Sequence, residues 1–301
     1  MKISGFSFAR NADRLGYPVA ESIRSILPVC DEFVIAIGKG DKGDRTRQLV
    51  AAVGSPKVRI IDTEWPENNT LGSGIYARQT NIALDACTGD WCFYIQADEA
   101  VHEQYLDTIR KRCKELLAVT TVEGLLFSYR HFWGDYQHLQ DGHKWYPREI
   151  RIVRNGIGAR SIGDAQSFRR NGKKLTVALA NAEVFHYGYV RDPRLMRRRN
   201  IAVETIYAGA GPVKKRPEEK SDVYDFGPLN RRTIFSGTHP AVMQERIRSM
   251  DWGGLLQAGG KPTTIHHHDR FKYRFLTFLE KTFFGGRQIG GYKNYVLKKN
   301  V

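Results

Sequence analysis

Two acidic residues, Asp98 and Glu99, follow closely after the apolar run at 91–95. Carboxylates at the end of a buried strand suit a hard divalent cation that holds a diphosphate. The simpler interpretation is that one of them caps the helix expected to follow. His186 lies in the last apolar run, 182–187, and is of interest only if the fold brings it to Asp98. A single histidine in a strand is otherwise more often a packed core residue.

A glycine-rich loop offers a second chemistry, the binding of a dinucleotide. The loop after the run at 32–37 has the spacing G-x-G-x-x-G, with glycines at Gly38, Gly40 and Gly43. Asp62 follows nineteen residues after the last of them, a spacing typical of nicotinamide-binding proteins. However, the carboxylates of Asp41 and Asp44 would face the pyrophosphate with no cation to offset their repulsion. For this reason a nicotinamide-dependent oxidoreductase is an alternative rather than the favoured interpretation.

The elements that must position these residues alternate along the chain. Apolar runs of strand length stand at 2–8, 32–37, 57–62 and 91–95. Helices are expected between them, at about 12–27, 44–53 and 76–86. Further along, a helix is expected at about 102–118 and strands at 124–132, 149–153 and 182–187. This alternation indicates βαβ units, so we expect an α/β fold with a mixed, mostly parallel sheet flanked by helices.

Composition excludes several classes of protein. The chain has 301 residues, of which 41% are apolar, and this supports a sizeable core rather than a disordered chain. No run approaches the roughly 18 apolar residues of a membrane-spanning helix, and the N-terminus carries no visible secretion signal. The four cysteines, which are expected to be reduced structural thiols, are Cys30, Cys87, Cys92 and Cys113. These features predict a cytoplasmic protein.

The charge is uneven along the chain. Residues 1–189 contain 25 basic and 22 acidic side chains, whereas residues 190–301 contain 22 and 10. We expect a nucleotide-binding and catalytic domain over residues 1–190 and a basic, mostly helical region over residues 191–301. The excess positive charge implies a polyanionic partner. No nucleic-acid-binding motif is present, so no specific nucleic acid is expected, and a non-catalytic polyanion-binding module is a further alternative.

Several segments form a recognisable set, namely FARN at 8–11, DKGDRT at 41–46, ARQTN at 77–81, TGDW at 88–91, QADE at 96–99, REIRIVR at 148–154 and FHY at 185–187. Together they resemble the inverting glycosyltransferases of family 2, which have the GT-A fold, and most closely their lipopolysaccharide-core branch. The counterparts in that family are ARNE, GSTDGT, ARN with GDW, DADE, REWRLRLFR and LHY. The resemblance extends from about residue 2 to about residue 190.

The resemblance implies a metal-dependent inverting enzyme that moves a sugar from a nucleotide-sugar to a saccharide or lipid-linked acceptor. Asp98 would bind Mn²⁺ or Mg²⁺, and His186 would close the site over the metal or the diphosphate. A UDP-sugar is the favoured donor and a GDP-sugar the alternative. The implied donor-binding residues are Phe8, Arg10, Asp41, Asp44, Arg78, Gln96 and Arg151. Gln96 replaces the first Asp of the family's metal-binding motif, so this position would offer only a neutral oxygen.

Three acidic residues are candidates for the base that takes the proton of the acceptor hydroxyl. The lipopolysaccharide-core branch has a His-Glu pair near residues 163–166, but the Glu position is Gln166 in this chain. Asp164 is therefore the first choice, and Glu149 and Asp135 follow it. A turn formed by Gly-Asp is the structural alternative for Asp164. The expected acceptor-binding residues, which would stack on a sugar face, are Trp133, Trp145 and Tyr146. The alternative for them is a packed surface loop.

The C-terminal part contains an aromatic, basic segment at 271–284 (FKYRFLTFLEKTFF). Phenylalanines at helical spacing beside lysines and arginines suit the surface of an anionic membrane, which would make the enzyme peripheral at the cytoplasmic face. The alternative is a terminal helix that packs its aromatic stripe on the catalytic domain. The basic runs at 197–199 and 214–216 match no base-reading motif, and the histidines at 266–268 are expected to form a solvated turn.

Overall fold

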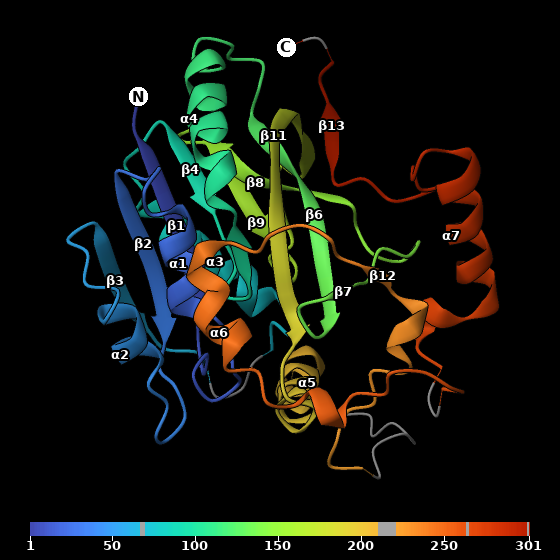
Figure 1. The fold of residues 1–301 in the computed structure, drawn as a ribbon. Helices are drawn as coiled ribbons and strands as arrows, with labels where there is room; N and C mark the ends of the chain where they lie inside the picture. Colours follow the sequence, from blue (N-terminus) through green and yellow to red (C-terminus); the bar gives the residue numbers. More distant parts are fainter. Residues whose placement is uncertain (67–69, 210–220, 263–264, 300) are drawn as a thin grey trace.

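A mixed β-sheet runs through the middle of the molecule (Figure 1), with the strand order β3-β2-β1-β4-β8-β6-β11-β10-β9. The computed structural model describes residues 1–66, 70–209, 221–262, 265–299 and 301. The strands of this path are β1 (Ile3–Ala9), β2 (Glu32–Gly38), β3 (Val58–Thr63), β4 (Trp91–Tyr94), β6 (Gly124–Gly134), β8 (Arg148–Arg154), β9 (Ala159–Ile162), β10 (Ser167–Arg170) and β11 (Lys173–Val190). Four short strands extend the sheet, namely β5 (Glu99–Val101), β7 (His138–Leu139), β12 (Thr233–Ile234) and β13 (Tyr295–Leu297).

The strands of the N-terminal half are parallel. β1 lies between β2 and β4, with Phe6 opposite Val34 on one side and opposite Tyr94 on the other. β8 runs antiparallel to both β4 and β6, whereas β6 and β11 are parallel. The predicted mixed, mostly parallel sheet is therefore confirmed. Parallel strands buried on both faces have continuous apolar sequences, which is why their runs are visible in the sequence.

Helices cover both faces of the sheet. α1 (Val19–Ile26), α2 (Thr46–Ala51) and α4 (Leu106–Glu115) pack on one face, where Ile35 and Phe93 are buried. α3 (Gly74–Asp85) and the β9–β10 hairpin cover the other face, where Val34 and Tyr94 are buried. Neighbouring residues of one strand thus enter opposite cores, as the two-residue period of a strand requires.

Two helices are shorter than the sequence indicates. Residues 12–17 form a turn before α1, in which the Tyr17 N–H donates to the Ala12 carbonyl at 2.8 Å and Gly16 has a φ of 69°. Asp44 does not cap the backbone of α2, because its carboxylate accepts the hydroxyl of Thr46 at 2.8 Å instead. β11 is much longer than the expected strand at 182–187, and the β9–β10 hairpin is a feature that the sequence patterns do not indicate.

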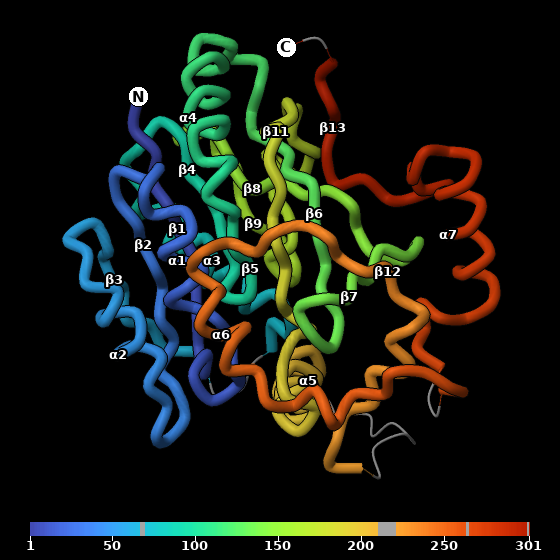
Figure 2. Tube along the Cα trace, in the orientation of Figure 1, coloured from blue at the N-terminus to red at the C-terminus, as the bar shows by residue number. Residues whose placement is uncertain are grey.

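The chain after β11 remains attached to the same sheet. α5 (Pro193–Ala208) follows β11 at once, and α6 (Gln244–Arg248) and α7 (Phe271–Phe283) come later. Figure 2 shows the segment between β12 and α6 crossing in front of β6 and β11, where Met243 packs with Phe132 and Phe185. β13 then pairs in parallel with β11. The described part of residues 191–301 therefore adds β12 and β13 to the sheet and packs against its strands.

Two expectations about the whole chain can be compared with the structure. All four cysteines are free and buried, as expected for structural thiols. Within the described ranges, no helix is both long and apolar enough to cross a bilayer.

Candidate active site

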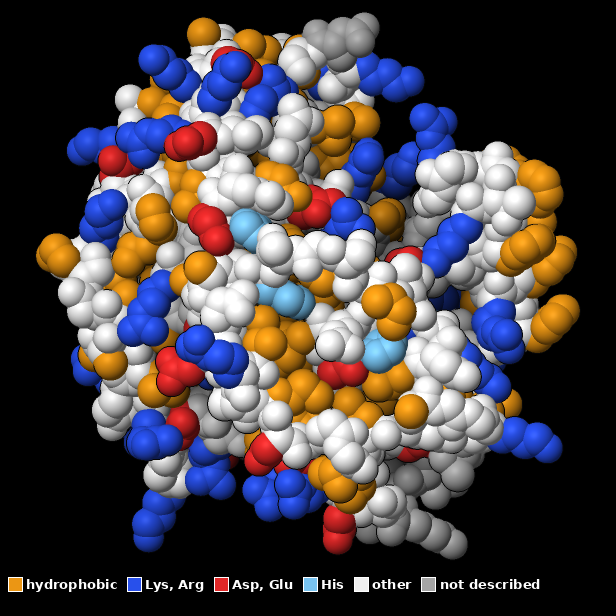
Figure 3. Space-filling view, viewed as in Figure 1, with side chains coloured by type: hydrophobic (Ala, Val, Ile, Leu, Met, Phe, Trp, Pro, Cys, Tyr) orange, Lys and Arg blue, Asp and Glu red, His pale blue; other side chains and the backbone are white. Residues whose placement is uncertain are grey.

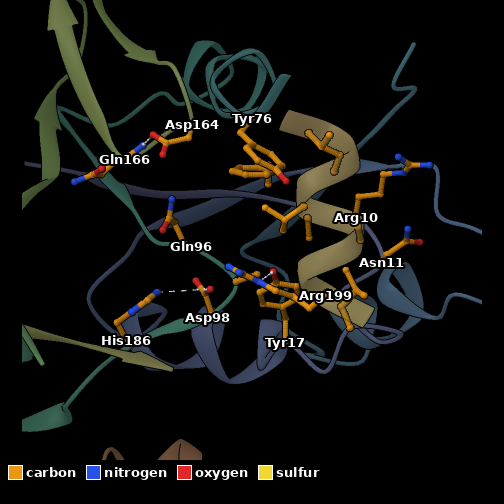
Figure 4. A pocket seen from close by; sticks show the side chains of 18 of the residues that line it. Arg10, Asn11, Tyr17, Tyr76, Gln96, Asp98, Asp164, Gln166, His186 and Arg199 are labelled. Atoms are coloured by element: carbon orange, nitrogen blue, oxygen red, sulfur yellow. Dashed lines mark hydrogen bonds and ion pairs between the residues drawn. The ribbon is translucent and has the colours of Figure 1, made fainter. Parts of the chain in front are cut away.

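A cavity of about 430 Å³ opens at the carboxyl ends of β1 and β4 (Figure 4). Its wall combines residues 8–12 at the end of β1 and just beyond it, residues 96–98 after β4, and one face of α5. β1 lies between two strands of the sheet. β2, which comes next in the chain, pairs with one side of β1, and β4 pairs with the other side. Ligands of open α/β sheets bind at such a point, where the strand order reverses.

Asp98 and His186 meet in this cavity although they are far apart in the sequence. β5 pairs antiparallel with β11, so that Glu99 stands opposite His186, and the Tyr187 N–H donates to the Asp98 carbonyl at 2.7 Å. This pairing holds Oδ2 of Asp98 3.7 Å from Nε2 of His186. Both residues are only 8% exposed, and Figure 4 shows the two side chains pointing toward one another. The fold thus supplies the proximity that the sequence leaves open.

A second histidine determines which nitrogen of His186 carries hydrogen. Nε2 of His131 lies 2.8 Å from the carbonyl oxygen of Tyr146, which can only accept, so this nitrogen donates. Nδ1 of His131, 3.0 Å from Nδ1 of His186, then accepts the N–H of His186. Burial holds the pKa of His131 well below its ordinary value, so His131 is neutral. By this network, neutral His186 keeps a free lone pair on Nε2, toward Asp98.

Gly188 packs closely against both side chains. A Cβ at Gly188 would stand 2.6 Å from Nε2 of His186 and 2.9 Å from Oδ2 of Asp98, so a larger residue there would displace the pair. Burial alone would raise the pKa of Asp98, but a proton on Nε2 of His186, together with the charges of Arg191 and Arg199, lowers it to about 2. A divalent cation bound by the two residues would take the place of that proton. An ionised carboxylate and a neutral imidazole are ligands that Mn²⁺ accepts, so the residues fit the cation.

Two protein ligands would leave most of the coordination to other groups. Among the residues that the structure describes, no cluster of three or more His, Cys, Asp or Glu side chains could hold a metal ion. Mg²⁺ is commonly bound through one or two carboxylates together with phosphate oxygens and water. A site with this pair therefore suits a cation that arrives with a diphosphate.

α5 places an arginine in the same wall. Nε of Arg199 donates to the hydroxyl of Tyr17 at 3.1 Å, and its Nη1 donates to Oδ1 of Asn200 at 3.2 Å. Burial disfavours the charge of Arg199, but Tyr17, Tyr189 and Asp98 outweigh burial and raise its pKa. Arg199 therefore stays charged in the cavity and is available to an anionic ligand.

Of the expected donor-binding residues, Phe8, Arg10 and Gln96 line the cavity. Phe8 packs against Tyr76 with ring centroids 5.6 Å apart. Arg10 donates from Nε to the carbonyl oxygen of Lys39 at 2.9 Å, and its guanidinium lies over the ring of Trp65 at 5.2 Å. These rings form an aromatic end of the cavity. Nε2 of Gln96 donates to the hydroxyl of Tyr94 and to the carbonyl of Ala165, both at 3.3 Å.

The other expected donor-binding residues do not line this cavity. Asp41 is exposed and pairs with Arg10 at 3.3 Å, so it can act only through that arginine. Asp44 is engaged with Thr46, and Arg78 is exposed on α3. Arg151 is buried and donates to both carboxylate oxygens of Glu99, at 2.9 and 2.7 Å. Its charge is thus neutralised inside the core, out of reach of a donor.

Packing accounts for the glycines of the loop at 38–43 without a dinucleotide. A Cβ at Gly38 would collide with the indole of Trp65, and a Cβ at Gly40 would collide with Asp44. Gly43 has a φ of 83°, which favours glycine. None of these three glycines lines the cavity. The loop glycines therefore lie outside the cavity in which the oxidoreductase interpretation would place a dinucleotide.

A second cavity, of about 610 Å³, adjoins the first and shares part of its wall, namely residues 144–146, Asp164 and Gln166. Oδ2 of Asp164 accepts the hydroxyl of Tyr207 at 3.2 Å. The next residue, Ala165, has a φ of 63°, which is uncommon for a residue with a Cβ. This turn presents the side chains of Asp164 and Gln166 at the junction of the two cavities.

Glu149 lines the second cavity but not the first. Its Oε1 accepts Nε2 of Gln166 at 2.9 Å and Nδ2 of Asn294 at 3.0 Å. Burial raises the pKa of Glu149 above its ordinary value despite these hydrogen bonds. Of the three acidic candidates for the base, Asp164 is thus the one that both cavities share.

The expected acceptor-binding aromatics separate into two groups. Trp145 and Tyr146 line both cavities. Trp133 is buried and lines neither, because its indole donates to the Phe226 carbonyl at 2.9 Å and its ring packs in the core. Asp135 accepts the backbone N–H groups at 137 and 138, so it holds a turn away from the cavities. Trp133, which was expected to contact an acceptor, is therefore a buried residue outside both cavities.

Two further C-terminal expectations differ in outcome. The histidines at 266–268 do not form a solvated turn, since His266 and His268 pack against Trp133 with ring centroids 5.4 and 4.9 Å apart. The basic run at 214–216 lies outside the described residues.

No protein-family model matches the sequence, and no curated protein matches it. Among solved structures, TarS of S. aureus is similar at 15% identity, over 68% of this chain and 40% of that chain, with a TM-score of 0.39. TarS residues 1–349 in complex with UDP-GlcNAc aligns over 70% and 67% at 15% identity, with a TM-score of 0.36. Glucosyl-3-phosphoglycerate synthase from Mycobacterium tuberculosis, with Mn²⁺, UDP and phosphoglyceric acid, aligns over 44% and 43% at 20% identity, with a TM-score of 0.30. The chain spans 40% of the first of these proteins, and similarities at TM-scores below 0.5 do not define a function.

Sequence reasoning missed several residues of the site. Tyr17, Trp65, Tyr76 and the inner face of α5 line the cavity, and His131 stands behind His186. The only signal for α5 is the arginine run at 197–199, which reads as a general basic patch. A histidine in the strand at 124–132 gives no signal until the neighbouring strand is known.

Proposed function

We propose that this chain is a metal-dependent inverting glycosyltransferase that moves a sugar from a nucleotide-sugar, with a UDP-sugar as the favoured donor, to a saccharide or lipid-linked acceptor. The observation that carries the proposal is the approach of Asp98 to His186 in the wall of the cavity. The cavity at this point is of the size that small ligands occupy. The sequence segments that resemble family 2 glycosyltransferases of the GT-A fold support the same class.

The donor would lie along the first cavity. Its base would stack at the aromatic end formed by Phe8, Trp65 and Tyr76. Its diphosphate would reach Asp98 and His186, where Arg199 offers charge-assisted hydrogen bonds. A divalent cation held by Asp98 and His186 would offset the negative charge that develops on the leaving diphosphate.

The acceptor would enter through the second cavity, between Trp145 and Tyr146. Its hydroxyl oxygen forms the new bond to the anomeric carbon while the bond from that carbon to the phosphate oxygen breaks. The bonding electrons leave with the nucleoside diphosphate, and the hydroxyl proton passes to the carboxylate of Asp164. The Tyr207 hydroxyl and the Gln166 N–H, which donate to that carboxylate, keep it oriented. A single displacement of this kind inverts the anomeric centre.

Calorimetric titration with UDP, in the presence and absence of Mn²⁺, tests the proposal. We expect UDP to bind tightly only with Mn²⁺, and both Asp98→Asn and Gly188→Ala to abolish the gain from the metal. Asp62→Asn is the matched control, because Asp62 is exposed and paired with Arg47 outside the cavity. Gly188 has no positive φ, so its alanine variant tests space rather than backbone strain.

The same titration separates the alternatives. Tight binding of NADH without metal would favour the nicotinamide-dependent oxidoreductase. A non-catalytic polyanion-binding module predicts salt-sensitive binding to any polyanion, unchanged by Asp98→Asn, and no release of UDP from UDP-glucose or UDP-GlcNAc.

A further inference from the structure

α7 carries its aromatic side chains on the surface of the molecule. The exposed fractions are 82% for Phe271, 51% for Phe275, 57% for Phe278 and 68% for Phe283. The spacing of the first three places them on one face of the helix, and Phe271 and Phe275 stack at 6.2 Å. Figure 3 shows hydrophobic side chains along the outer edge of the molecule, where α7 lies in Figure 1. The aromatic stripe therefore does not pack on the catalytic domain.

Polar contacts hold the inner face of α7. Glu280 is buried, and its Oε1 accepts Nδ1 of His143 and the N–H of Ile289, both at 2.6 Å. Oγ1 of Thr277 accepts the backbone N–H of His143 at 2.9 Å. A helix on a water-soluble domain normally turns its apolar face to the core and its polar face to water. α7 instead leaves Phe271, Phe275 and Phe278 exposed, so this apolar stripe is left for a partner.

The charge beside the stripe selects the chemistry of that partner. Residues 270–287 contain one acidic side chain, Glu280, and five basic ones, Arg270, Lys272, Arg274, Lys281 and Arg287. Glu280 is engaged with His143, whereas Lys272 and Arg274 are exposed. An apolar stripe flanked by cations complements a surface that is anionic outside and apolar beneath.

We propose that α7 is a docking helix for an anionic lipid bilayer. Its phenylalanines would enter the boundary between headgroups and acyl chains, and its lysines and arginines would lie against the lipid phosphates. A folded protein partner would need an acidic rim around an apolar groove. The excess of basic over acidic residues throughout 190–301, 22 against 10, favours an extended anionic surface instead.

Docking through α7 would bring the second cavity close to the lipid. Gln288, Tyr292 and Asn294, which follow α7, form one wall of that cavity. The loop at 143–146 forms another wall and is held by α7 through Thr277 and Glu280. Resting on the proposed function, this placement favours a lipid-linked acceptor over a free saccharide.

Co-sedimentation with vesicles tests the docking independently of any turnover. The full chain is mixed with vesicles of phosphatidylcholine alone or with added phosphatidylglycerol. We expect binding to the anionic vesicles, and a loss of roughly fivefold in affinity for each cation removed in Lys272→Ala and Arg274→Ala. Replacing Phe271, Phe275 and Phe278 together by serine should weaken binding by at least about tenfold. These side chains are exposed, so the variants are expected to keep the melting temperature of the wild type.

Matched controls come from other helices. Ile201→Ser removes an apolar side chain of comparable exposure, 46%, from α5, and the pair Lys111→Ala and Lys114→Ala removes two exposed cations from α4. Both controls should bind like the wild type. Failure of the wild type to bind anionic vesicles at low salt, or equal binding by the triple serine variant, would overturn the proposal. The proposal would also be overturned if light scattering showed that the wild type is a dimer and the triple serine variant is a monomer. Metal-dependent UDP binding would be unaffected by any of these outcomes.

Discussion

The Nδ1 atoms of His131 and His186 lie 3.0 Å apart, and this contact directs the free Nε2 of His186 toward Asp98. His131 is itself anchored through Nε2 to the carbonyl of Tyr146 at 2.8 Å. Tyr146, which lines both cavities, and His186, the candidate metal ligand, are therefore joined by one chain of hydrogen bonds through His131. Hydrogen-bond partners behind a metal-binding histidine fix its tautomer and ring orientation.

Replacing His131 by phenylalanine should lower the affinity for Mn²⁺ by roughly 10- to 100-fold, because His186 loses the acceptor that fixes its tautomer. Electron paramagnetic resonance of free Mn²⁺ in a titration measures this affinity directly. His102→Phe is the matched control, since His102 is also buried and bonds Thr238 outside the cavity. Unchanged Mn²⁺ affinity in a folded His131→Phe variant would contradict the role of His131.

Arg199→Ala should weaken the binding of UDP in the presence of Mn²⁺ by about 10- to 100-fold, the usual effect of losing hydrogen bonds to a charged group. Calorimetry is the measurement. The adjacent Arg198 is exposed and lies outside the cavity wall, so Arg198→Ala should bind UDP like the wild type. Equal losses in the two variants would point to a general charge effect and remove Arg199 from the donor site.

Asp164→Asn should leave the dissociation constant of UDP unchanged and slow sugar transfer roughly 10²- to 10⁴-fold, as expected on removing a general base. The asparagine keeps an oxygen that can accept the Tyr207 hydroxyl. Release of UDP from a UDP-sugar with saccharide acceptors gives the rate, and calorimetry gives the affinity. If donor affinity falls and the rate at saturating donor does not, Asp164 belongs to the donor site.

Glu149 predicts a dependence of stability on pH. Because burial raises its folded pKa above the ordinary 4.5, the folded protein still binds the proton at pH values where the unfolded chain has released it. The contribution of Glu149 to stability is therefore greatest below pH 4.5 and falls as the pH rises through the folded pKa. Melting curves of Glu149→Gln should show a melting temperature at neutral pH at least as high as the wild type. The difference should vanish at acidic pH, and the exposed Glu64, replaced by glutamine, should show no such trend.

Arg151→Ala should lower the free energy of unfolding by about 3–5 kcal/mol, since it leaves the carboxylate of Glu99 buried without its partner. Urea denaturation measures this, and replacing Glu99 and Arg151 together by leucine and methionine should recover part of the loss. Arg78→Ala, on the exposed face of α3, should change stability by less than about 0.5 kcal/mol. A stable Arg151→Ala variant with weakened UDP binding would restore the donor-binding role expected from the sequence.

The sequence by itself determined the alternation of strands and helices, because local apolar periodicity reflects which faces of each element are buried. It also determined that Asp98 lies at the carboxyl end of β4, since the change from apolar to polar residues marks the end of a buried strand. It also indicated that residues 271–284 carry an aromatic stripe with cations, because that pattern is contained within one helix.

Only the tertiary structure decided which of these residues meet. His186 reaches Asp98 because β5 pairs with β11, and that register is set by contacts between segments with no local signature in either. Arg151 and Trp133, polar or aromatic candidates in the sequence, proved to be buried with partners of their own, Glu99 and Phe226. Arg199 entered the cavity because α5 packs across the ends of the strands. Burial and long-range pairing are properties of the whole chain, so no window of sequence contains them.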